Sequence, residues 1–154
     1  MTIETAYGTR PASLPRSLVR LTRADNGLLW VGRAGVELLD FAQHHRYQTE
    51  SLDRFPHHRD GTIDWAAVDP ELVLGKATTD FDTAMPQWLD ILGDHVVIIW
   101  SLVVVPTVLM AADLFAQSLS EISATSAEFW IYSPDTGVLV ENTFAGQLTA
   151  ARVP

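Results

Sequence analysis

An uncharged segment at residues 96–112 constrains the fold of this chain more than any other feature. It lies between His95 and Asp113, is rich in Val and Ile, and is interrupted by Pro106. Its length is near the lower limit for a helix that crosses a bilayer, but no Lys or Arg flanks it as an anchor. Because β-branched residues at this density favour strands, the segment predicts a buried strand over residues 95–105 rather than a membrane span.

The first third of the chain predicts a hairpin followed by a helix. Residues 17–22 and 28–33 have the pattern of strands, and the Asn26-Gly27 pair between them readily adopts the positive φ angles of a tight turn. An apolar face that extends to about His45 predicts the helix, with Gly35 at its entry. The side chains that make up this face are Val36, Leu38, Leu39, Phe41, Ala42 and Gln43.

The middle of the chain predicts a loop and two short helical segments. Residues 48–61 have a loop-like composition with mixed charge, and residues 64–68 predict a single helical turn. Asp82 or Thr83 is expected to cap a helix that runs to Leu92. Pro86 would lie in the first turn of this helix, where proline is tolerated.

The last part of the chain predicts one helix and two strands. Apolar residues recur at three- and four-residue steps over 109–122, which is typical of a helix. Residues 128–133 and 138–142 predict strands that are joined by a proline-led turn at 134–137. Together these elements predict one α+β domain over residues 1–154, with a mixed or antiparallel sheet, helices packed on one face and a C-terminal β-α-β-β order.

Charge is distributed unevenly along the chain. There are 10 Lys and Arg against 19 Asp and Glu, for a net charge of -9. Between Asp60 and Asp94, eight carboxylates accompany a single base, Lys76, so this segment alone carries a net charge of about -7. Nucleic acid is not an expected partner, because binding it requires clustered Lys and Arg. The absence of Cys and of an apolar leader favours a cytoplasmic protein without disulfides.

Two short motifs resemble catalytic or phosphate-binding sequences but lack the surroundings that such chemistry needs. Asp135-Thr136-Gly137 spells the aspartic protease triplet, yet a Ser-Pro pair precedes it in place of an apolar strand, so we expect a hairpin turn. Gly75-Lys76 resembles part of a phosphate-binding loop. That loop requires an earlier glycine where Pro70 stands and a hydroxyl where Ala77 stands, so we expect a surface loop instead.

Two histidine pairs are the group in this sequence that best suggests a metal site. His44-His45 and His57-His58 have acidic neighbours, but adjacent residues on a helix point about 100° apart, and no HExxH motif is present. We therefore predict neither a metal nor a cofactor. Asp80 and Asp82 suggest a catalytic carboxylate pair, although their spacing is equally typical of an exposed segment that leads into a helix cap.

Three classes of function are compatible with these features. A partner-binding module needs only a stable fold and a complementary surface, which the acidic segment supplies for a basic partner protein. A small cytosolic enzyme with a His/Asp site and a structural, self-assembling protein are the alternatives. Aromatic side chains among carboxylates would serve as binding anchors. The predicted partner-binding residues are Asp64, Trp65, Asp69, Glu71, Asp80, Asp82 and Trp88.

The overall pattern resembles the immunity proteins of bacterial polymorphic toxin systems. The features that carry the resemblance are the acidic, Cys-free composition, the long Val/Ile strand, the helix after it and the Trp-bearing strand at residues 128–133. The resemblance implies a cytoplasmic inhibitor that occludes the active site of a cognate toxin, such as a nuclease or an NAD-degrading enzyme. It rests on architecture and charge, and it assigns no individual residue.

Overall fold

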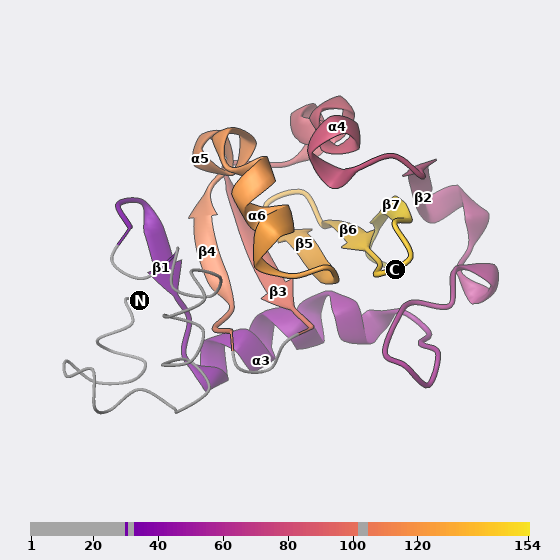
Figure 1. The fold of residues 1–154 in the computed structure, drawn as a ribbon. Helices are drawn as coiled ribbons and strands as arrows, with labels where there is room; N and C mark the ends of the chain where they lie inside the picture. The colour runs from indigo at the N-terminus through magenta and orange to yellow at the C-terminus, as the bar shows by residue number, and fades with distance from the viewer. Residues whose placement is uncertain (1–29, 31–32, 102–104) are drawn as a thin grey trace.

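One antiparallel sheet forms the centre of the protein (Figure 1). The computed structural model describes Trp30 and residues 33–101 and 105–154. Within these residues the sheet has seven strands in the order β1-β4-β3-β5-β6-β7-β2, and every neighbouring pair is antiparallel. The strands are β1 Val36–Leu38, β2 Val73–Ala77, β3 His95–Trp100, β4 Val108–Ala111, β5 Phe129–Ser133, β6 Val138–Asn142 and β7 Leu148–Arg152.

Helices lie on both faces of the sheet (Figure 1). α4, α5 and α6 cover one face, and α3 lies across the other, where Tyr47 contacts Tyr132 of β5 edge to face. The α+β class is confirmed, and the expected strand-helix-strand-strand order occurs as β4, α5 with α6, β5 and β6. The helix on the second face was not expected. The helices are α3 Phe41–Glu50, α4 Phe81–Ala84, α5 Ala112–Gln117 and α6 Leu119–Thr125, with 3-10 turns η3 Leu52–Arg54, η4 Trp65–Ala67, η5 Pro70–Leu72 and η6 Met85–Ile91.

The sheet separates two apolar clusters, and β3 contributes to both. Val96, Ile98 and Trp100 enter the main cluster beneath α4–α6, while Val97 and Ile99 enter the second cluster on the α3 side. This alternation follows from the two-residue period of a strand. Because β3 is buried on both faces, its sequence is a continuous apolar run. No helix within the described ranges is long and apolar enough to cross a membrane.

The predicted strand over residues 95–105 is buried as expected but ends at Trp100. The chain then returns as β4, which pairs with β3 from Ile98 opposite Val108 to His95 opposite Ala111. The Trp100 indole donates a hydrogen bond to the Pro106 carbonyl at 3.0 Å, which fixes the return. The helix predicted over 109–122 therefore begins only after β4, at α5.

The helix predicted from Val36 begins five residues later. Val36 and Leu38 are instead strand residues that pair with β4 and bury their side chains. Asp40 then caps α3, because its side chain accepts a hydrogen bond from the Gln43 amide at 2.8 Å and the Gln43 side chain accepts one from the Asp40 amide. As the first residue of α3, Phe41 is 82% exposed rather than buried.

Other predicted elements differ in extent. The helix expected from Asp82 to Leu92 is one α-turn, α4, followed by the 3-10 segment η6, where Pro86 lacks the amide hydrogen that would continue an α-helix. The turn at 64–68 is present as η4, and the two strands at 128–133 and 138–142 are confirmed as β5 and β6. The hairpin predicted over residues 17–33 lies outside the described residues, apart from Trp30 and Arg33.

Candidate partner-binding surface

Loops from five strands meet at one end of the sheet. The register connects Trp100 to Phe129, Phe129 to Asn142, Asn142 to Leu148, and Leu148 to Ala77. β3, β6 and β2 end at this row, whereas β5 and β7 begin there. Segments that are far apart in the sequence therefore converge at this end, where their loops form a surface on a rigid support.

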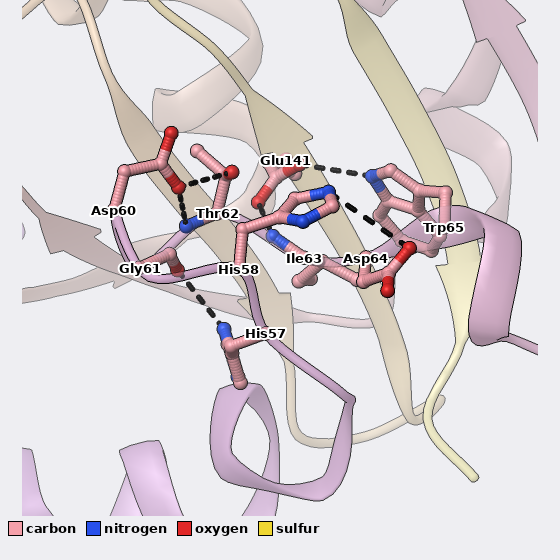
Figure 2. Close-up of polar contacts among 9 residues, drawn as sticks. All are labelled: His57, His58, Asp60, Gly61, Thr62, Ile63, Asp64, Trp65 and Glu141. Carbon is pink, nitrogen blue, oxygen red and sulfur yellow. Dashed lines mark hydrogen bonds and ion pairs between the residues drawn. The ribbon is translucent and has the colours of Figure 1, made fainter.

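Glu141 of β6 anchors the segment around η4, which precedes β2 in the chain, to the sheet. Its carboxylate is 1% exposed and accepts hydrogen bonds from the Ile63 amide at 2.8 Å and from the Trp65 indole at 2.9 Å (Figure 2). The Trp130 indole donates a third, at 2.8 Å. A buried carboxylate is strongly destabilising unless donors replace its hydration. The three donors supply that replacement and hold residues 63–65 against β6.

The residues ahead of η4 form a tight loop that is closed by its own polar groups (Figure 2). Gly61 takes a φ of 93°, and Asp60 Oδ1 accepts hydrogen bonds from the Thr62 hydroxyl at 2.6 Å and the Thr62 amide at 2.9 Å. These bonds, the hydroxyl's above all, lower the pKa of Asp60. The His57 ring lies between two carbonyl oxygens, with Nδ1 2.9 Å from that of Gly61 and Nε2 2.6 Å from that of Leu52.

This loop lies between two hollows of the surface. The smaller, of about 380 Å³, is lined by His58, Asp64 and Trp65 on one side and by Lys76 at the end of β2. His58 Nε2 lies 3.8 Å from Asp64 Oδ1 (Figure 2). Trp65 is partly exposed, and its ring packs edge to face on Phe55 with the ring centroids 5.5 Å apart.

The larger hollow, which we name the large cavity, has a volume of about 620 Å³. It is lined by Phe41 and His44 of α3, by the segment from Leu52 to Gly61, and by the ends of β3 and β5. His44 Nδ1 is 2.5 Å from the Thr107 hydroxyl oxygen. Burial lowers the pKa of His44, and its neighbour His45 adds to this effect, which favours the neutral form of His44.

Residues 33–151 match a family model described as CdiI immunity protein EcoliA0-like. The chain belongs to this family of CdiI immunity proteins. The predicted resemblance to immunity proteins of bacterial toxin systems is thereby confirmed, and the partner that the family implies is a cognate toxin. A comparison with curated proteins found no match.

The acidic residues predicted to bind the partner of this immunity protein fall into two groups. Asp64, Asp69 and Glu71 follow one another on the α3 side of the sheet, where Asp69 Oδ1 caps η5 by accepting a hydrogen bond from the Glu71 amide at 3.0 Å. Asp80 and Asp82 lie at α4, on the other side. β2, at the edge of the sheet, connects the two groups. Apart from the partly buried Asp64, these acids are exposed.

The two tryptophans predicted as anchors have different environments. Trp65 is partly exposed at the smaller hollow. Trp88 is only 7% exposed and belongs to the main apolar cluster, where its ring fills the space above Gly75. A Cβ at Gly75 would lie 3.0 Å from that ring. Trp88 therefore stabilises the fold, and its side chain is not available to a partner.

The motifs set aside in the sequence have structural roles in the immunity protein. Asp135 lies in the β5–β6 turn, where its Oδ2 accepts a hydrogen bond from the His95 amide at 3.0 Å. His44 and His57 both line the large cavity, while His58 faces the smaller hollow. In the described part of the chain, no three His, Asp or Glu side chains are grouped so that they could hold a metal ion.

Three residues of this surface were not anticipated from the sequence. Phe41 and Phe144 are each 82% exposed, Phe41 at the rim of the large cavity and Phe144 in the turn between β6 and β7. Glu141 is buried although it lies in a predicted strand among apolar residues. A lone carboxylate in such a strand was the one available signal, because a buried charge requires partners from elsewhere in the fold.

Proposed function

We propose that this immunity protein neutralises its cognate toxin in the cytoplasm by covering the toxin's active site with an acidic surface. That surface consists of the residues that flank β2 on both sides: Asp64, Trp65, Asp69 and Glu71 with Asp80 and Asp82. The family match is the observation that carries the proposal, because it implies a toxin as the partner. The charge of the segment from Asp60 to Asp94 supports the choice of surface.

The charge also supports a class of toxin. An enzyme that cleaves nucleic acid or NAD binds phosphates, so its active site is surrounded by basic side chains. Four exposed carboxylates near one sheet edge complement such a surface and accelerate encounter with it. The two acidic groups lie on opposite sides of β2, so we expect the toxin to contact both sides of this edge strand.

Inhibition of the purified toxin tests this proposal. The cognate toxin domain would be assayed on nucleic acid and on NAD while the immunity protein is titrated into it. We expect loss of toxin activity at one equivalent of immunity protein and competition between the immunity protein and the toxin's substrate. Full toxin activity in the presence of excess immunity protein would contradict the neutralising role. Inhibition that substrate does not compete with would contradict occlusion of the active site.

A further inference from the structure

The large cavity combines an apolar floor with a rim of carboxylates. Leu39, Leu52, Ile99 and Trp130, all of the second apolar cluster, supply apolar walls. A hollow of about 620 Å³ exceeds the volume of one side chain and is within the size range of sites that bind several groups of a ligand. Its apolar walls favour an occupant that brings carbon surface as well as polar atoms.

Four acidic residues are among those that line this cavity: Asp40, Asp53, Asp60 and Glu128. In each, the hydrogen bonds within the described chain fall on one oxygen. Asp40, Asp53 and Asp60 accept through Oδ1, and Glu128 accepts through Oε2 from the Phe144 amide at 3.4 Å. The second oxygen of each carboxylate can therefore accept bonds from an occupant.

No Lys or Arg of the described residues forms an ion pair with these four carboxylates. Arg33 pairs with Glu121, and Arg46 pairs with Glu50 at 3.1 Å, both away from the rim. Burial disfavours the charged form of His44, which also lines the cavity, so its ring adds little positive charge there at pH 7. A cation from a partner would be attracted to this rim, and more strongly than at an open surface because the walls exclude water.

Phe41 adds an exposed aromatic ring at the rim. It is 82% exposed and lies nearly parallel to the His45 ring, with the ring centroids 6.2 Å apart. An aromatic face beside carboxylates suits a guanidinium, which stacks on rings and donates paired hydrogen bonds to carboxylates. An ammonium on a flexible stem uses such a setting less well, because it is a compact charge without a planar face.

We propose that the large cavity receives an arginine side chain on a protruding loop of the cognate toxin, an inference that rests on the proposed function. The guanidinium binds carboxylates of the rim and lies against Phe41, while neighbouring side chains of the loop fill the apolar floor. The cavity is on the same side of the sheet as Asp64, Asp69 and Glu71, so one toxin can contact both. The acidic surface then speeds encounter, and the cavity slows dissociation.

Binding kinetics with the purified cognate toxin domain test this inference. Two cavity variants are used. One is the double variant Asp53→Asn, Glu128→Gln, and the other is the single variant Phe41→Ala. We expect each to raise the dissociation rate about tenfold or more, as central interface residues do. Asp90→Asn with Asp113→Asn removes two exposed charges elsewhere, and Phe144→Ala removes an equally exposed ring that does not line the cavity. These two controls should dissociate within about twofold of the wild type.

The arginine itself is tested on the toxin side. Surface arginines of the toxin are replaced one at a time by lysine, and we expect one replacement to weaken binding to the wild type but not to the Asp53→Asn, Glu128→Gln variant. Unchanged affinity for every replacement would overturn the arginine assignment. Wild-type dissociation rates in both cavity variants would overturn the cavity as a site while leaving the proposed function intact. A wild type that neither binds nor inhibits the toxin would overturn both proposals.

Discussion

Glu141 and Trp65 are 76 positions apart in the chain, and the indole N–H of Trp65 donates to Glu141 Oε1 at 2.9 Å. This bond and the one from the Ile63 amide connect the acidic segment to the sheet. The position of Asp64, Asp69 and Glu71 on the α3 side thus depends on one buried carboxylate. The loop carries the charges, and β6 determines where they lie.

Replacement of Glu141 should destabilise the fold strongly. Glu141→Ala leaves the Ile63 amide and two indole N–H groups without an acceptor, so we expect the free energy of unfolding to fall by about 3–5 kcal/mol. Glu141→Gln keeps one acceptor oxygen, so we expect it to lower the free energy of unfolding by only about 1–3 kcal/mol. Denaturant unfolding followed by Trp fluorescence measures both. Glu71→Gln, an exposed change, serves as control, and a Glu141→Ala variant as stable as that control would contradict the anchoring role.

Stability should fall as the pH decreases through the range where free histidine titrates. Burial lowers the pKa of His44 from 6.5, so the unfolded chain takes up a proton there before the folded chain does. The contribution of His44 is therefore fully present above about pH 7.5 and is lost as pH falls through 6.5 toward the lowered folded value. Thermal unfolding midpoints across this range should drop less in His44→Gln than in the wild type. His45→Gln removes a smaller contribution to the lowered pKa of His44, so its pH dependence should lie between those of the wild type and His44→Gln. Equal pH dependence in the wild type and His44→Gln would exclude this role.

Gly93 should not tolerate even a methyl group. Its amide donates to the Ser133 hydroxyl at 2.9 Å, and a Cβ built on it would overlap with the Cβ of Asp135. We expect Gly93→Ala to lower the free energy of unfolding by about 2 kcal/mol, because the turn after β5 must move. Thr136→Ala changes an exposed residue of the same turn and should have little effect. Equal unfolding midpoints for the two variants would show that the turn shifts freely.

The strands with strong local patterns were predictable, and those defined by pairing were not. Residues 138–142 begin with the apolar run Val-Leu-Val after a proline-led turn, and β6 has those bounds. β2 and β7 were missed because Val73–Ala77 contains a Gly-Lys pair and Leu148–Arg152 is rich in Ala, which has low strand propensity. They form because β2 pairs with β7, a contact between distant parts of the chain, and because β7 pairs with β6 across a short turn.

Of the proposed partner-binding surface, the sequence predicted only which charged side chains would be exposed to solvent. A carboxylate in a polar segment is expected to be exposed. This holds for Asp69, Glu71, Asp80 and Asp82. Their division between the two sides of β2 depends on the strand that the sequence did not reveal. The large cavity could not be foreseen, because Phe41 and Glu128 line it together only once α3 packs against the sheet that contains β5.

The central claim is that the acidic surface brings the toxin to this protein. Asp69→Asn, Glu71→Gln, Asp80→Asn and Asp82→Asn remove four charges that are exposed, so stability should change by less than about 0.5 kcal/mol. The control is Asp113→Asn, which removes one exposed charge outside the segment from Asp60 to Asp94. Attraction between distant charges raises the association rate. Salt screens that attraction, over about 8 Å at physiological ionic strength, so the rate should depend on salt.

The deciding measurement is the association rate of the fourfold variant with the cognate toxin, taken at low and at physiological salt beside the wild type and the control. The account predicts that the variant associates about tenfold more slowly than the wild type at low salt and that its rate depends less on salt. It also predicts that the control keeps a rate close to that of the wild type. Equal association rates for variant and wild type at low salt would contradict the acidic surface as the site of encounter.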